Sequence, residues 1–499
     1  MFCKKTQLIL ALALERAVLI RRNRFGRCLA LVTTGLLICS AVASAQLQGK
    51  PVPHPVYVSS DDALSPLTGI RDLTCASPPC VLPNVQVSSN QANSLLIATN
   101  PANSVDLLAS EWAESACNGT VALTSIDDGT QWVSNCFRNL AEDGDPAIAY
   151  GRKSLYAAGA TDPPPAYVQV STNNGKTWSE PIEVTPPLLN GDTNVPWLAV
   201  DNVSDGAFKN AAYLSVTQFD NLIVESEISA SHSTDEGQSW TTTTVDPVQY
   251  KPVVDQFSRM VVGKDGTVYV AWQRCTMTSK WINCADTKAS MLLSKSTDGG
   301  NTWSDPVVIA IVKLVPDTCD GCFNPFFGNL PNTNEGMGNM PVLAIDNSTG
   351  KYAGNLYAAI YDWTGKQMRA EVVTSTDGGS TWGQPVPVVP ATETHDQFFP
   401  TIAVSPGGVL GVGWLDRRND PINISYQPFA AVSSNGGATF GKNYVLASNL
   451  SDPYLDGEGG GYMGDYIGAS WSGNNFLVTW PDTRSMQYMQ DYLGGLRIK

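Results

Sequence analysis

Histidine and basic residues are scarce in this sequence of 499 residues. The chain has 3 histidines, and its 31 lysines and arginines are outnumbered by 46 acidic residues, which gives a formal net charge of −15 at pH 7. A chain this acidic repels nucleic acids and anionic membranes, so neither is expected as a partner. An anionic ligand would have to be bound by a local group of arginines, because the field of the whole molecule opposes it.

Patterns that bind metals are also sparse. Cys319-Asp-Gly-Cys322 has the spacing of half a zinc site or of a redox pair, but the sequence has no second pair with this spacing. No loop matches an established calcium-binding motif, although 452–465 is rich in Asp, Glu and Gly. We therefore expect no cofactor and no catalytic metal, and a structural calcium ion is the one alternative left open.

The first 45 residues have the composition of an export signal. Four arginines between positions 21 and 27 precede an apolar run over 29–42, and Ala43-Ser44-Ala45 offers small residues for cleavage. We expect 1–45 to be a signal peptide and 46–83 an N-terminal extension of a secreted or periplasmic protein, with no membrane insertion after cleavage. An uncleaved membrane anchor is the alternative.

Eight of the 11 cysteines follow this signal and form close sequential couples. Because an exported chain reaches an oxidising compartment, each couple is expected to form a local disulfide. The expected pairs are Cys75 with Cys80, Cys117 with Cys136, Cys275 with Cys284, and Cys319 with Cys322.

An eight-residue phrase, Ser-x-Asp-x-Gly-x-Thr-Trp, recurs six times. Clear copies cover 296–303 and 375–382, and looser copies begin at Ser125, Ser171, Ser233 and Ser433. The Asp can accept backbone N–H bonds, the Gly tolerates positive φ, and the Trp fills an apolar space. Each copy joins two short strand-like runs, so it is expected to be a hairpin turn. Spacings of 46 to 79 residues, about one four-stranded sheet each, are typical of a β-propeller.

A second recurring phrase describes the hairpin before each turn. Asp255 to Val262 runs on to Trp272, and Asp396 to Ala403 runs on to Trp414. Five more copies make seven units, and the seventh lacks its outer strand, which an N-terminal stretch such as 52–58 could supply. The expected fold is all-β, a single propeller of four-stranded blades over 84–499, with seven blades favoured and six as the alternative. The other five copies start near Asn84, Asp143, Asp192, Gly338 and Gly464.

Function is expected on the face opposite the repeated turns, where innermost strands begin and second strands end. Asp192, Asp255 and Asp396 share one register at the start of innermost strands, and Glu142 matches it. These acidic residues either line the axial mouth or simply cap strand ends.

Second strands end in a further set of residues. Arg274, Arg418 and Arg484 occupy equivalent places on three blades. If they converge, they can bind a carboxylate bidentately, and the alternative is that each forms a salt bridge between loops. Asp416, Asp482 and Trp414 are grouped with them as substrate-binding residues.

Catalytic candidates follow from glycosidic cleavage by an acid and a nucleophile. Asp255 and Asp396 are the expected acids. The expected nucleophiles and their activating bases are Tyr361, Tyr462 and Tyr466, with Glu458 or Glu335.

The repeated turns and hairpins resemble the Asp-boxes, or BNR repeats, of the sialidase-like propeller family, and they cover nearly all of 84–499. Gly464-Asp-Tyr466 with Trp480-Pro-Asp-Thr-Arg484 is similar to a phrase common in its bacterial members. The resemblance implies an exo-glycosidase that cleaves a terminal acidic sugar such as sialic acid from a glycan. It also implies three arginines on the sugar carboxylate, an Asp acid and a Tyr–Glu nucleophile pair.

Sialidases also have six blades and an Arg-Ile-Pro segment in the first blade, which this sequence lacks. The nearest innermost-strand arginine is Arg259, in Phe257-Ser-Arg-Met260. Because one fold hosts many tasks, a non-catalytic propeller that binds glycan or protein is the main alternative. Its binding face would include Tyr361, Trp363 and Trp414. A calcium-stabilised scaffold is a third hypothesis.

Overall fold

The computed structural model describes residues 75, 77–113, 117, 119–137, 145–160, 165–184, 191–220, 225–278, 284–317, 328–457 and 461–499. The predicted signal peptide, the segment 52–58 and the predicted site residues Glu142 and Glu458 lie outside these ranges. Within them, no helix is long and apolar enough to cross a membrane.

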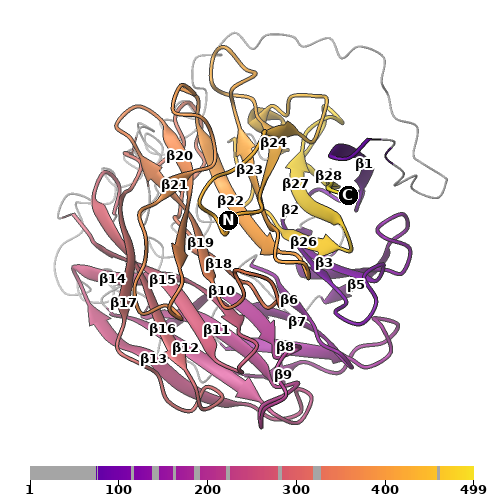
Figure 1. Cartoon of the computed structure of the whole chain (residues 1–499), viewed down its shortest axis with the longest axis vertical. Coiled ribbons are helices and arrows are strands. Elements are labelled where there is room, and N and C mark those ends of the chain that lie inside the picture. Colours follow the sequence, from indigo (N-terminus) through magenta and orange to yellow (C-terminus); the bar gives the residue numbers. More distant parts are fainter. Residues whose placement is uncertain are drawn as a thin grey trace, which may run out of the picture. The chain divides into compact units, whose positions relative to one another are not determined.

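The described residues form seven antiparallel sheets of four strands each, and the seven-bladed propeller is confirmed (Figure 1). First strands of successive blades contact one another all the way round, so they are the innermost strands. One short 3-10 helix, η1 (Pro453–Leu455), lies between blades 6 and 7.

The first three blades contain twelve strands. Blade 1 consists of β2 (Ala92–Thr99), β3 (Leu107–Ala113), β4 (Gly119–Ser125) and β5 (Val133–Phe137). Blade 2 consists of β6 (Ala147–Tyr150), β7 (Leu155–Ala160), β8 (Ala166–Ser171) and β9 (Ile182–Glu183). Blade 3 consists of β10 (Gly191–Val200), β11 (Ala212–Asp220), β12 (Glu225–Ser233) and β13 (Thr241–Tyr250).

The remaining four blades contain sixteen strands. Blade 4 consists of β14 (Val253–Val262), β15 (Val268–Thr276), β16 (Lys288–Ser296) and β17 (Val307–Lys313), and blade 5 of β18 (Val342–Ile345), β19 (Leu356–Trp363), β20 (Met368–Ser375) and β21 (Val386–Pro387). Blade 6 consists of β22 (Gln397–Val404), β23 (Leu410–Asp416), β24 (Gln427–Ser433) and β25 (Tyr444–Val445). Blade 7 consists of β26 (Ala469–Ser472), β27 (Asn475–Asp482), β28 (Gln490–Arg497) and β1 (Cys80–Gln86).

Blade 7 is completed by a strand from the other end of the chain. β1 pairs antiparallel with β28, from Cys80 opposite Arg497 to Gln86 opposite Tyr492. The outer strand that the sequence predicts at 52–58 is therefore supplied by Cys80–Gln86. Closure in this way pairs the edge of β28, which would otherwise be open.

Each of the six predicted turns follows the third strand of its blade, and the phrase's first Ser is the last residue of that strand. In blade 4 the Ser296 hydroxyl donates to Asp298 at 2.8 Å and accepts the Gly300 N–H at 2.8 Å. The side-chain and backbone bonds from Thr302 lower the pKa of Asp298 to about 2. The turn satisfies its own polar groups, so it is structural.

Four innermost strands contain a β-bulge, which bends a strand locally. Non-glycine residues with positive φ occur at the register shifts of β2, β10, β14 and β22. A β-branched residue in this conformation is strained, so the tertiary structure must impose the bend. The four residues are Ser94, Val195, Phe257 and Phe399.

Three of the four predicted disulfides are confirmed, and they link Cys75 to Cys80, Cys117 to Cys136 and Cys275 to Cys284. Cys319 and Cys322 lie outside the described residues, so their pairing stays a prediction.

If the chain is exported as its sequence predicts, mass spectrometry of unreduced peptides should find all four local pairs and no free thiol at these positions, because the partners are close in sequence and an oxidising compartment keeps such pairs linked. Scrambled partners, or alkylated free cysteines at these positions, would contradict this pairing.

Candidate functional site

In blade 7 the predicted arginine forms a fork with the carboxylate two residues before it. Arg484 donates to Asp482 through its Nε at 3.0 Å and its Nη2 at 2.6 Å. Asp482 is fully buried and also accepts Trp480 Nε1 at 2.9 Å. The guanidinium covers the ring of Tyr492 at 3.9 Å and donates to Asn84 Oδ1 on β1. Arg484 is therefore directed toward the outer strand of its own blade.

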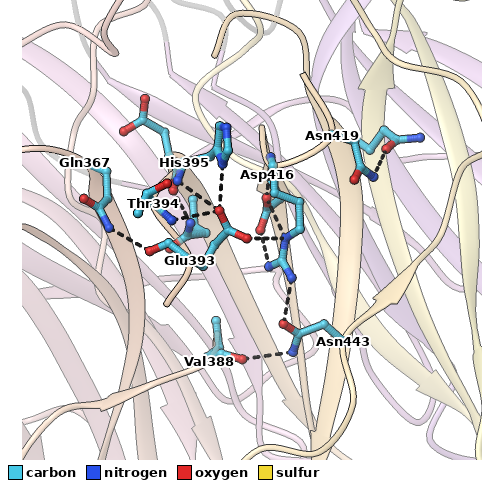
Figure 2. Close-up of polar contacts among 12 residues, drawn as sticks. Gln367, Val388, Glu393, Thr394, His395, Asp416, Asn419 and Asn443 are labelled. Carbon is cyan, nitrogen blue, oxygen red and sulfur yellow. Dashed lines mark hydrogen bonds and ion pairs between the residues drawn. The ribbon is translucent and has the colours of Figure 1, made fainter. Parts of the chain in front are cut away.

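Blade 6 repeats this arrangement around Asp416, which Figure 2 shows together with Glu393 and Asn443. Arg418 Nε donates to buried Asp416 at 2.9 Å, and Trp414 Nε1 donates to the same carboxylate at 2.7 Å. A further bond runs from Arg418 Nη1 to Asn443 Oδ1 at 3.1 Å, and Glu393 lies 3.8 Å from Arg418 Nε. The residues grouped as substrate-binding in blades 6 and 7 are thus parts of two equivalent buried networks.

The acidic candidates also have partners within the fold. Arg274 binds Asp255 bidentately at 2.7 Å and contacts Asp246 of blade 3. Burial raises the pKa of Asp255 to about 7 although Arg274 opposes the shift. Asp396 accepts the Asn423 side-chain amide at 2.7 Å. Every one of the three predicted arginines is therefore bound by a buried carboxylate, and their role as a sugar clamp stays a prediction.

Two predicted nucleophiles have no activating base in their hydrogen bonds. The Tyr361 hydroxyl donates to Met337 O at 2.8 Å, and the Tyr466 hydroxyl donates to Pro146 O at 2.9 Å. Burial raises the pKa of both phenols. A phenol bound to a carbonyl and removed from water is not prepared to lose its proton.

A fully buried arginine lies on the innermost strand of blade 4. Arg259 is 1% exposed, and its guanidinium lies 4.3 Å from the ring centre of Trp197 and 5.2 Å from that of Tyr466. It donates to Ser258 O and contacts the Met340 sulfur, but its Nε has no hydrogen-bond partner among the residues that the structure describes. Burial lowers the pKa of Arg259 to about 10. A buried guanidinium without a bonded carboxylate is costly, so this position requires an explanation.

Beside this arginine, a tyrosine is bound to a partly buried carboxylate. The Tyr462 hydroxyl donates to Asp465 Oδ2 at 2.8 Å. Burial raises the pKa of Asp465, while Tyr462 and the positive charge of Arg259 act in the opposite direction. Asp145 and Asp465 both interact electrostatically with Arg259. We call Arg259, Asp145, Tyr462 and Asp465 the axial cluster.

The axial cluster borders a narrow cavity between the innermost strands of blades 5, 6 and 7. Its empty volume is about 290 Å³, part of which is open to solvent. Tyr466 and Met340, which contact Arg259, also line it. The full lining is Gly338, Asn339, Met340, Val342, Tyr361, Phe399, Pro400, Asp465, Tyr466 and Ile467.

Two loops are bonded to each other near this cavity. Glu335 Oε2 accepts the Met463 N–H at 2.5 Å, and the Tyr454 hydroxyl donates to Asn332 O at 2.8 Å. Glu335, a predicted activating base, is thus bonded to backbone. A sugar ring could reach the cavity only if 328–341 moved away from 452–457 and 461–468, the segments that these bonds hold together.

The predictions from sequence missed Asp465 and Asp145 as site residues. They named Arg259 as an arginine of an innermost strand but did not assign it to the site. A signal was present for Asp465, because Tyr462 and Asp465 are three residues apart in a loop between blades. Burial of Arg259 had no sequence signal, since it depends on Trp197 and Tyr466 from other blades.

No protein-family model matches this sequence, and no curated protein matches it. Among solved structures, the chain is similar to a GH93 α-L-arabinofuranosidase of Fusarium graminearum, with 11% identity and a TM-score of 0.44 over 84% of this chain and 98% of that chain. It is also similar to the polysaccharide lyase Uly1, with 8% identity and a TM-score of 0.49 over 86% and 94% of the two chains.

A sialidase of Trypanosoma rangeli in complex with sialic acid is similar too, with 11% identity and a TM-score of 0.40 over 83% of this chain and 58% of that chain. At these identities and TM-scores the similarities say nothing about the activity of this chain.

Proposed function

We propose that the protein is an exported glycosidase that binds a terminal acidic sugar of a glycan at the axial cluster. The observation that carries this proposal is the buried Arg259 guanidinium, whose Nε lacks a partner beside a tyrosine bonded to a carboxylate. A sugar carboxylate would supply the missing charge-assisted hydrogen bonds. Sialic and uronic acids carry such a carboxylate.

In this proposal each member of the cluster has one role. Asp465 accepts the proton of the Tyr462 hydroxyl, and the phenolate oxygen attacks the anomeric carbon. Asp145 protonates the departing glycosidic oxygen and then activates the water that releases the sugar. Arg259 holds the sugar carboxylate and favours the ionised form of Asp465.

A glycan-binding propeller without hydrolysis is the second candidate. The small cavity and the raised pKa of Tyr462, caused by burial and then by the Asp465 charge, favour it. Hydrolysis requires the two loops to separate and the phenol to become easier to ionise when the ligand is bound.

Tyr462→Phe should abolish release of fluorophore from whichever fluorogenic sialoside or uronide the wild-type protein cleaves, because the nucleophilic oxygen is gone. Tyr426→Phe is the matched control, since Tyr426 is fully buried and its hydroxyl donates to Pro481 O outside the cavity lining. Full activity of Tyr462→Phe would contradict the assigned nucleophile. A wild-type protein that binds acidic sugars but cleaves none of them would contradict the glycosidase and support the glycan-binding propeller without hydrolysis.

A further inference from the structure

Two carboxyl side chains are buried against each other where the first and last blades meet. Glu111 is on β3 of blade 1, and Asp491 is on β28 of blade 7. Both residues are 0% exposed, and their carboxyl groups interact with each other. Neither residue belongs to the axial cluster.

The other partners of this pair are neutral. Asn90 Nδ2 donates to Glu111 Oε1 at 2.9 Å, and the Ser88 side chain also bonds Glu111. Glu111 Oε2 and both oxygens of Asp491 have no other hydrogen-bond partner in the described part of the chain. Neither carboxyl takes part in an ion pair with another described residue. Two buried carboxylates in contact cannot both carry a charge without a cation.

Charged groups on the neighbouring strands do not compensate a negative charge on Glu111 and Asp491. Asp482 on β27 is already paired with Arg484. Tyr426 is sensitive to the charge of Asp491, but its hydroxyl donates to Pro481 O. The remaining option within the described structure is a proton between the two carboxyls.

We propose that Glu111 and Asp491 share one proton, and that this proton helps to lock the ring closed. The backbone places the pair at the closure itself, because Asp491 O accepts the Val87 N–H at 2.8 Å directly after β1. Asn90 lies in the connection from β1 to blade 1. Loss of the proton would put two like charges between blades 1 and 7 and would weaken the pairing of β1 with β28.

The direction of the pH dependence follows from the raised pKa values. Burial raises the pKa of Glu111, and burial together with the Glu111 charge raises the pKa of Asp491 well above its usual value. Asp and Glu in the unfolded chain titrate at about pH 4, so the stabilisation by the shared proton is complete below that pH. It is lost as the pH rises through the folded pKa of the pair, which titrates as one unit.

Amide hydrogen exchange at several pH values tests the lock in the full mature protein. After correction for intrinsic exchange, protection in β1 and β28 should fall by about tenfold or more between about pH 5 and about pH 9. Glu111→Gln should remove most of this fall, because its amide can donate to Asp491 while its oxygen still accepts from Asn90. Asp491→Asn should act in the same way, so the test does not depend on one variant.

Glu371→Gln is the matched control. Glu371 is buried on β20 of blade 5, and burial raises its pKa to about 7. This variant should change the pH dependence of blade 5 and leave that of β1 and β28 intact. An unchanged fall at β1 and β28 in both Glu111→Gln and Asp491→Asn would overturn the proposal. Protection that rises with added calcium and falls with a chelator would also overturn it, because a cation would then hold the pair.

Discussion

Arg259→Met should lower the hydrolysis of an acidic glycoside by about 10²-fold or more, the usual effect of removing a preorganised charged donor. The same change should leave the free energy of unfolding unchanged or raise it by about 1 to 4 kcal/mol, because a buried and poorly partnered charge is replaced by an apolar chain of similar length. Fluorogenic assays and urea unfolding measure the two effects. Their combination would indicate that Arg259 is kept for a ligand.

The opposite combination would defeat this interpretation. If Arg259→Met unfolds the protein, Arg259 has a structural role between Trp197 and Tyr466. If the variant is stable and as active as the wild type, the carboxylate of the sugar is bound elsewhere. In that case the predicted arginines of the second strands would again be the candidates.

Arg484→Met should lower the free energy of unfolding by about 3 to 5 kcal/mol, since it leaves the buried carboxylate of Asp482 without its partner. Burial alone would raise the pKa of Asp482, and the fork from Arg484 holds it below its usual value. Urea unfolding of the variant measures the loss. Residual folded protein should cleave or bind the acidic sugar as the wild type does.

A double variant separates the charge from the packing. Asp482→Asn combined with Arg484→Met should recover part of the lost stability, because the neutral amide still accepts from Trp480 Nε1. Equal stability of Arg484→Met and the wild type would show that the fork is unimportant. If a stable Arg484→Met variant selectively lost sugar binding, the result would support the hypothesis that Arg484 binds the sugar carboxylate.

The fold could be read from the sequence because its turns are local. The eight-residue phrase contains every polar group that the turn needs, such as Ser296 and Asp298, so residues a few positions apart determine it. The count of seven also followed from repeated hairpins. The sequence indicated that an N-terminal stretch such as 52–58 could close the last blade, and the strand that pairs with β28 is Cys80–Gln86. Its exact position had no local signal, because this pairing joins residues at opposite ends of the described chain.

The site was less predictable for the same reason. Arg418 and Arg484 occupy equivalent positions in the sequence. This pattern is expected both for a pair of arginines that bind one sugar and for a salt bridge repeated in each blade. Only the structure shows that each is directed toward its own outer strand, through Asn443 and Asn84. The axial cluster joins residues from three separate parts of the chain, namely blade 4 and two connections between blades, and no spacing along the chain relates these three parts.

Closure by β1 determines the order in which the molecule can be completed. Arg484 and its partner Asn84 are 400 residues apart, and contacts of such long range form late in folding. Blades 1 to 6 are each continuous in sequence and can form one after another, but β1 waits for β28. Until then the newly made chain presents two unpaired strand edges, which can pair with another chain. The interval just before closure is therefore when two copies are most prone to exchange their first strands or to aggregate.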